Sequence, residues 1–286
     1  MSILQILILA IVQGAAELLP ISSSAHVIVA AKLMHLDPSS PEMTLLLVML
    51  HTGTMLAVIL YFWKSWRANY FFSGKTLWHF SKLVIIATAL TGIVGIAIKY
   101  LIEKFALRNI PNAEVELLFS NLLLIAIALA AVGVLIIYAG YYEKRSKPTS
   151  LLDLGTSIWI GLIQGICLPF RGFSRSGATI STGLLLSIDK IKAEEFSFTL
   201  AVVVTPPVIA REVLRLLKAH TMTVSRTTDL MSLFYPSLIG MLFSFISGIL
   251  ALRLLSSWLE KDRWQYFGFY CLFASCMVFL LQHIGF

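Results

Sequence analysis

Long apolar segments dominate the chain, and two of them are interrupted by short polar motifs. Continuous apolar stretches occupy residues 43–63, 83–101, 117–142, 196–218, 233–257 and 264–286. A helix needs roughly 20 residues to cross a bilayer, so each stretch predicts one membrane span. The apolar segments 3–36 and 151–188 carry polar residues and a proline near their centres. Each of these two predicts a helical hairpin that enters the membrane without crossing it.

The order of one hairpin and three spans occurs twice along the chain. The first repeat covers 1–142, the charged segment EKRSKPTS at 143–150 is a linker, and the second repeat covers 151–286. The two hairpins also match in sequence, as IVQGAAELLPISSSAH and LIQGICLPFRGFSRSGAT. An odd number of spans in each half predicts that the halves have opposite orientations in the membrane. The predicted fold is an all-α polytopic membrane protein with an inverted-topology repeat, each half a re-entrant helical hairpin plus three transmembrane helices.

Composition agrees with an integral membrane protein. The chain has 286 residues, of which 58% are hydrophobic and 13% charged, and its mean hydropathy is +0.86. Its N-terminus lacks the basic region of a signal peptide, so we expect no cleaved leader. Three cysteines without CxxC spacing favour neither a disulfide nor a zinc site. The net charge of +7 is spread over loops, which suits anionic lipid and predicts no nucleic-acid surface.

The first polar motif, QGAAELLPISSSAH, runs from Gln13 to His26. Pro20 predicts the end of one helix, and the three serines after it are good N-cap residues for the next. A helix start carries unpaired N–H groups and the positive end of the helix dipole, which suits a phosphate. Glu17 precedes the break, and the spacing places His26 on the same helix face as Ser23. A kinked helix with a serine cap and one satisfied histidine is the structural alternative.

The second polar motif contains an arginine within an apolar hairpin. A charged side chain there costs roughly 2.5–3.5 kcal/mol at the bilayer centre, so Arg175 predicts a functional role. Its neighbours at a predicted helix start are Ser174, Ser176, Gly177 and Thr179. A guanidinium beside hydroxyl and N–H groups is typical of a phosphate site. A purely structural Glu17–Arg175 pair is the alternative.

These two motifs carry a resemblance to a known family. QGAAELLPISSSAH resembles the (E/Q)xxxE-x-P-x-SS-x-x-H region of the undecaprenyl pyrophosphate phosphatases, the bacitracin-resistance family, and RGFSRSGAT resembles their PGxSRSxxT signature. The resemblance covers essentially the whole chain. It implies hydrolysis of a polyprenyl pyrophosphate to its monophosphate, recycling of the lipid carrier of cell-wall synthesis and bacitracin resistance. It also implies a Mg²⁺ or Ca²⁺ cofactor and a site open to the outer face of the bacterial inner membrane.

The resemblance, together with the residue chemistry above, assigns a set of candidate roles. We expect catalytic roles for Glu17, Ser23, His26 and Arg175. The expected metal ligands are Glu17 and Gln13. The expected substrate-binding residues are Ser22, Ser24, Arg171, Ser174, Ser176, Gly177 and Thr179. The chain departs from the family pattern at Gln13, where many members have glutamate, at Ala25, a usual glycine, and at Arg171, a usual proline. An amide cannot act as a base, so acid–base chemistry would fall on Glu17.

The mechanism stays open at the level of sequence. Ser23 is the preferred nucleophile, with His26 as its base, and the rivals are His26 itself or a metal-bound water. A polyprenyl-phosphate transporter or flippase is the alternative function, because such proteins share inverted repeats and midplane helix breaks. SSSAH resembles the PSGH block of another lipid-phosphatase superfamily only superficially. Homodimerisation is also left open.

Further patterns concern orientation and individual residues. Eleven Lys and Arg residues fall in one set of loops and seven in the other, which predicts that the first set faces the cytoplasm. His51 is expected to lie in a packed, kinked helix rather than at the site. Residues 64–82 are expected to form a basic, aromatic loop, and Pro206–Pro207 are expected to break a helix. The aromatic run Trp264–Tyr270 is expected to lie at the membrane interface.

Overall fold

The computed structural model describes residues 1–37, 40–106, 121–145, 151–222 and 230–284. The start of the third expected span and most of the expected linker lie outside these ranges. The described residues form ten α-helices and one π-helical turn, η1 (Ile102–Ala106). The α-helices are α1 (Ile3–Leu18), α2 (Ser23–Leu33), α3 (Pro41–Asn69), α4 (Gly74–Leu101), α5 (Leu122–Arg145), α6 (Leu154–Cys167), α7 (Arg175–Leu185), α8 (Lys190–Met222), α9 (Leu230–Glu260) and α10 (Gln265–His283).

The helices fall into two length classes, as the sequence predicts. Within the described ranges, six helices are long and apolar enough to cross a membrane: α3, α4, α5, α8, α9 and α10. The four others form the hairpins α1–α2 and α6–α7, and the longest of them, α1, has 16 residues. At 1.5 Å per residue it is about 24 Å long, short of the roughly 30 Å apolar core. The all-helical, multi-pass class is therefore confirmed, while the inverted relation of the halves stays a prediction.

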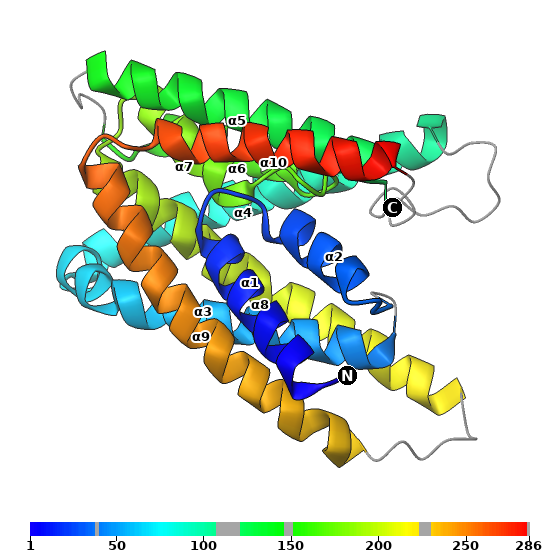
Figure 1. Cartoon of the computed structure of the whole chain (residues 1–286). Helices are drawn as coiled ribbons and strands as arrows, with labels where there is room; N and C mark the ends of the chain where they lie inside the picture. Colours follow the sequence, from blue (N-terminus) through cyan, green and yellow to red (C-terminus); the bar gives the residue numbers. More distant parts are fainter. Residues whose placement is uncertain (38–39, 107–120, 146–150, 223–229, 285–286) are drawn as a thin grey trace.

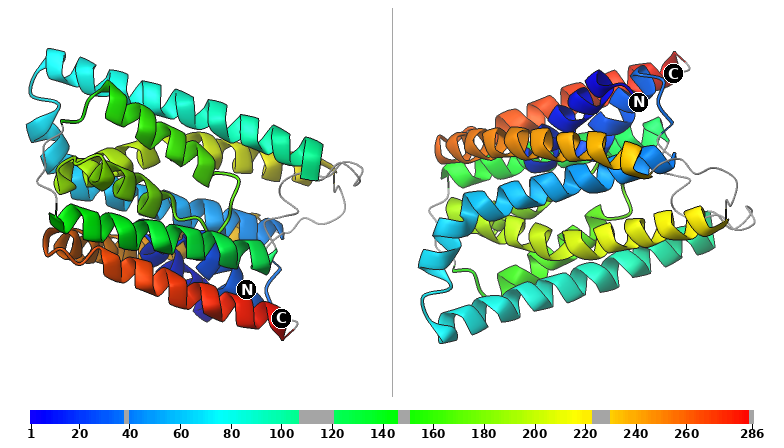
Figure 2. Two further views of the ribbon diagram at one scale, coloured as in Figure 1. Left: turned by 90° about the horizontal axis from the view of Figure 1, so that it is seen from above. Right: turned by 90° about the horizontal axis from the view of Figure 1, so that it is seen from below.

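The long helices form the walls around the short hairpins. Helices α5 and α10 lie side by side along their length in both Figure 1 and Figure 2, and α3 packs against α8 and α9. Helix α1 packs against α9 and α3, whereas α6 packs against α4. Helix α7 contacts α5 and α8 and buries most of its residues, from Ser176 to Ser181 without interruption. Ser22 and Ser174, at the two hairpin turns, are both buried in the protein interior.

Two glycines let α9 approach α1 and α3 closely. A Cβ added at Gly14 would lie 2.5 Å from the Ser244 carbonyl oxygen, and one at Gly53 would lie 2.3 Å from that of Met241. Both distances are shorter than carbon and oxygen tolerate, so any side chain would force the helices apart. The Ser244 hydroxyl donates to the Leu50 carbonyl at 3.0 Å and fixes the same crossing. This packing sets the position of α1 relative to α3.

Two local expectations were wrong. The segment 64–82 is mostly helical, since α3 continues to Asn69 and α4 begins at Gly74. The reason is a helical period that buries Phe62 and Trp66 while Lys64 and Arg67 stay exposed. Helix α8 runs through Pro206–Pro207 without ending. Membrane helices tolerate proline where neighbouring helices and Ser or Thr side chains support the backbone. Helix α8 packs against its neighbours, and the Thr205 hydroxyl donates to the Ala201 carbonyl at 2.7 Å.

The close α3–α9 crossing generates a stability prediction. Gly53→Ala should destabilise the protein by roughly 1–3 kcal/mol, the usual effect of overpacking, because its methyl group meets the Met241 backbone. Thermal unfolding in detergent measures the effect as a lower midpoint. Gly92→Ala on α4 is the matched control, because nothing lies within 4 Å of its added Cβ. That variant should unfold at the wild-type temperature or above it, by the usual preference for alanine in helices. Equal midpoints for both variants would contradict the close crossing.

Candidate functional site

The first hairpin presents an uncapped helix start. Helix α1 ends at Leu18, directly before Leu19 and Pro20, and α2 begins at Ser23, as the sequence predicts. Ser22 takes φ 68°, a left-handed conformation that non-glycine residues rarely adopt. The first turn of α2 receives no side-chain bond from Ser22, the N-cap residue. Its N–H groups therefore remain available to an anion.

The second hairpin brings Arg175 to the same place. Gly172, with φ 99°, turns the chain, and Ser174 caps α7 by accepting the Gly177 N–H at 3.2 Å. The Gly172 N–H donates to the Ser24 hydroxyl at 3.4 Å. Ser176 bonds to the Leu19 carbonyl at the same distance. The two interrupted hairpins therefore meet, and their polar turns form one cluster.

Glu17 is the centre of this cluster. The Ser23 hydroxyl donates to Glu17 Oε2 at 2.6 Å, and the Gln13 amide donates to the same oxygen at 3.1 Å. Arg175 Nη2 lies 3.2 Å from Oε1, and the two charged side chains are only 19% and 17% exposed. Both carboxylate oxygens are thus engaged, one by a cation from the other half of the chain. Two of the other expected catalytic residues, Ser23 and Arg175, therefore contact Glu17 directly.

His26 points away from Ser23. Its Nδ1 lies 2.8 Å from the Ser22 carbonyl and its Nε2 lies 2.8 Å from the Tyr270 hydroxyl. A carbonyl only accepts, so Nδ1 carries the ring proton and Nε2 accepts from Tyr270. The shared helix face predicted for His26 and Ser23 therefore does not produce a hydrogen bond between them. The group positioned to take the Ser23 proton is Glu17.

Two residues join the site that the sequence did not assign to it. Tyr270 on α10 bonds and stacks with His26, with ring centres 5.6 Å apart. In the sequence it is one of several aromatics in an interfacial run, and no local signal separates it. His51 on α3 lies 3.0 Å from the Gln13 amide nitrogen and 3.8 Å from Glu17 Oε2. The sequence feature that could have indicated this role for His51 is a polar residue within an apolar span.

The expected substrate-binding residues divide into three groups. The Ser22 and Ser24 hydroxyls lie 3.3 Å apart beside the α2 start. Arg171 is exposed next to Gly172, where the hairpins meet. The remaining residues support α7 from inside the protein, and Thr179, for example, is fully buried and bonds to Ser197 at 2.6 Å. That supporting group is Ser174, Ser176, Gly177 and Thr179.

A divalent cation would find few protein ligands here. Among the described residues, no group of three or more His, Cys, Asp or Glu side chains could hold a metal ion. Glu17 offers a carboxylate, and Gln13 turns its amide nitrogen rather than its oxygen toward Glu17. Mg²⁺ binds through one or two carboxylates when substrate phosphates and water supply its other ligands. The donor set therefore fits an ion held mainly by a phosphate ligand, with Glu17 as its protein ligand.

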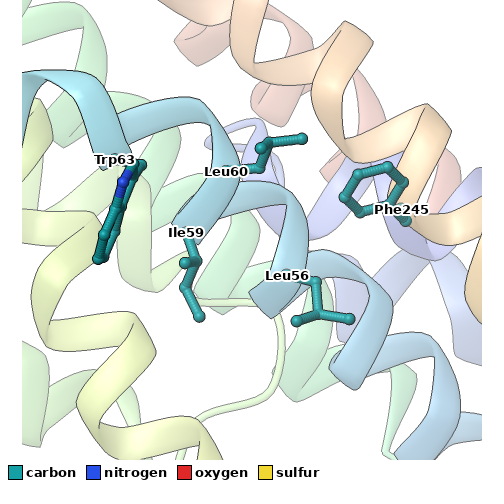
Figure 3. A pocket seen from close by; sticks show the side chains of 5 residues that line it. All are labelled: Leu56, Ile59, Leu60, Trp63 and Phe245. Carbon is teal, nitrogen blue, oxygen red and sulfur yellow. The ribbon is translucent and has the colours of Figure 1, made fainter.

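An apolar pocket lies on the other side of α3. Its lining residues are Leu56, Ile59, Leu60, Trp63 and Phe245, and its volume is about 570 Å³ (Figure 3). Leu60 follows His51 by about two and a half turns of a 3.6-residue helix, which puts it on the opposite face. None of the polar cluster lines this pocket. Its surface suits a hydrocarbon chain and is separate from the Glu17 site.

Comparison with known proteins gives full-length matches. The family model described as bacitracin resistance protein BacA matches residues 6–277. Undecaprenyl-diphosphatase 2 of Acinetobacter baylyi is 53% identical over 282 residues, which is 98% of each chain. Undecaprenyl-diphosphatase of Thermodesulfovibrio yellowstonii is 34% identical over 275 residues, or 96% of this chain and 95% of that one. The enzyme of the same name from Desulfitobacterium hafniense is 31% identical, covering 97% of this chain and 95% of its own.

The contact between the hairpins generates a second stability prediction. Arg175→Met should destabilise the protein by roughly 3 kcal/mol, because it leaves the Glu17 carboxylate without its cation. Adding Glu17→Gln should restore most of the loss, and thermal unfolding in detergent measures both. Lys99→Met is the control, since the Lys99–Glu103 pair is far more exposed and such pairs contribute about 0.5 kcal/mol. A double variant no more stable than Arg175→Met would contradict the pairing.

Proposed function

The chain belongs to the bacitracin resistance protein BacA family, and from that membership and the Glu17 site we propose that it hydrolyses undecaprenyl diphosphate to the monophosphate and inorganic phosphate. Relatives that match nearly the whole chain are named undecaprenyl-diphosphatases. The observation that carries the proposal is the contact of Arg175, Ser23 and Glu17 beside an uncapped helix start. Few sites that only bind a lipid would need a serine hydroxyl held by a carboxylate.

The diphosphate would bind where the two hairpins meet. Arg175 supplies a guanidinium that can form two parallel hydrogen bonds to phosphate oxygens. The first turn of α2 supplies unpaired N–H groups and the positive end of the helix dipole. Phosphoryl transfer depends mainly on such positioning and charge neutralisation. These groups lie in a membrane-embedded interior where water screens charge weakly, which strengthens each contact.

The geometry favours Ser23 as the nucleophile. Its hydroxyl oxygen would attack the terminal phosphorus while its proton passes to Glu17 Oε2, the oxygen it already bonds to at 2.6 Å. The bond from that phosphorus to the bridging oxygen breaks, and the lipid monophosphate leaves, taking the proton from Glu17. Water then attacks the phosphoserine, Glu17 accepts the proton of the water and returns it to the Ser23 oxygen as inorganic phosphate is released. The rival nucleophiles are His26, which is held by Ser22 and Tyr270, and a water bound to a divalent ion.

We also propose a cellular setting for this reaction. The chain is a multi-pass membrane protein, and the excess of Lys and Arg in one set of loops favours the bacterial inner membrane with that set in the cytoplasm. The site would then open to the outer face. Hydrolysis there would recycle the lipid carrier for peptidoglycan synthesis and oppose bacitracin.

Phosphate release from undecaprenyl diphosphate by purified protein in detergent tests the activity. Ser23→Ala and Arg175→Ala should each lower kcat/KM by about 100-fold or more, the usual scale for losing a nucleophile or a charge-stabilising donor. Ser73→Ala and Arg263→Ala are matched controls on loops remote in sequence from both polar motifs, and they should keep wild-type activity. Folded wild-type protein that binds the lipid without releasing phosphate would instead favour a transporter.

Removal of divalent ions tests the expected cofactor. EDTA should abolish phosphate release, and added Mg²⁺ or Ca²⁺ should restore it, because an ion held by Glu17 would neutralise phosphate charge. Glu17→Gln should raise the Mg²⁺ concentration needed for half-maximal activity as well as lower kcat. Full activity after exhaustive chelation would exclude the ion from the reaction.

A further inference from the structure

His51 occupies a position in the Glu17 cluster that the proposed chemistry leaves unused. It projects from α3, whereas the other members come from the two hairpins. Its Nδ1 faces Gln13 and Glu17, at 3.0 and 3.8 Å. The side chain is 37% exposed, compared with 17% for Glu17. Within the described residues, both of these contacts involve Nδ1, and the other ring nitrogen, Nε2, takes part in neither.

The neighbours of Gln13 decide which of its atoms faces His51. The Gln13 amide group touches the Glu17 carboxylate at 3.1 Å, and Glu17 is ionised beside Arg175. An ionised carboxylate only accepts hydrogen bonds, so the atom facing it must be the NH₂ nitrogen. The same nitrogen lies 3.0 Å from His51 Nδ1. Its two hydrogens therefore serve one acceptor each, Glu17 and His51.

This bond fixes the protonation state of His51. Nδ1 accepts a hydrogen bond and so carries no proton, which places the single ring proton on Nε2. Glu17 from α1, the carboxylate beside Nδ1, is already paired with Arg175 from α7. A second ring proton on Nδ1 would face the Gln13 N–H directly. The cluster thus holds a neutral imidazole whose N–H points away from Gln13.

We propose that neutral His51 donates its Nε2–H to an oxygen of the bound diphosphate, with Gln13 as the positioning residue that sets its tautomer. The inference rests on the proposed function for the identity of the ligand. His51 contributes a hydrogen bond without transferring a proton. Arg175 and His51 lie on opposite oxygens of Glu17, so they would contact the diphosphate from two sides. An oriented neutral donor of this kind stabilises charge that develops on phosphate oxygens.

The chain offers a direct kinetic test. His51→Ala should lower kcat/KM by about 10- to 100-fold, the scale of a hydrogen bond to a charged group. His51→Gln should stay within about threefold of wild type, because its amide can place an N–H near the position of Nε2. The pH profiles of wild type and His51→Gln should have the same shape. His79→Gln, at an exposed histidine on α4, should change nothing. A His51→Gln enzyme as slow as His51→Ala, with one limb of its pH profile missing, would overturn the proposal in favour of proton transfer.

A spectroscopic test is independent of activity. In ¹⁵N-histidine-labelled protein in detergent, the signals missing from His51→Gln should be those of a ring with bare Nδ1 and protonated Nε2. Farnesyl diphosphate should shift the Nε2–H signal. Gln13→Glu should move the proton to Nδ1, since a carboxylate only accepts. A proton on Nδ1 in the wild-type protein would overturn the inference even if hydrolysis is measured. If the spectra show the expected tautomer but the protein releases no phosphate, the tautomer assignment holds and only the proposed function is wrong.

Discussion

The ion pair between Glu17 and Arg175 is the contact on which the arrangement of the two halves depends. Each partner lies in a short hairpin that cannot span the membrane and that places a charge in an apolar setting. Neither charge is tolerable there alone, so the two hairpins must meet. Because the desolvation of both groups offsets their attraction, the pair adds little net stability over apolar packing. A chemical role therefore explains this pair better than a stabilising role does.

The site divides its chemistry between the two short hairpins and the long helices around them. The carboxylate, hydroxyl and helix start come from α1–α2, and the guanidinium comes from α7. The surrounding long helices provide the remaining orientation. Helix α9 holds α1 and α3 at glycine crossings, which brings His51 to Gln13, and α10 contributes Tyr270 to His26. Two hairpin residues, Gln13 and His26, are therefore oriented by partners on membrane-crossing helices, as precise catalysis requires.

The sequence predicted what is encoded locally. Apolar length predicted the six spans, and Pro20 and the serines predicted the α1–α2 turn. The isolated charges assigned Glu17 and Arg175 to one site, with their direct pairing only as the alternative to a phosphate contact. The sequence did not assign His51 and Tyr270 to the site, because their contacts form only when the long helices pack and neither residue lies in a distinctive motif. The predicted Ser23–His26 interaction rested on helix spacing alone, which places residues on one face without fixing where side chains point. The expected break at Pro206–Pro207 was wrong because proline propensity is overridden inside a packed membrane helix.

Glu17 and Arg175 are 158 residues apart in the chain, so the ribosome makes Glu17 well before Arg175. At synthesis rates of about 5–20 residues per second, Arg175 emerges roughly 8–30 s after Glu17. During that interval the carboxylate has no cation, and α1–α2 is too short to anchor itself across the bilayer. The first hairpin therefore lacks its ion-pair partner until the second hairpin has been synthesised. Assembly of the Glu17 site is in this sense completed by the carboxyl-terminal half.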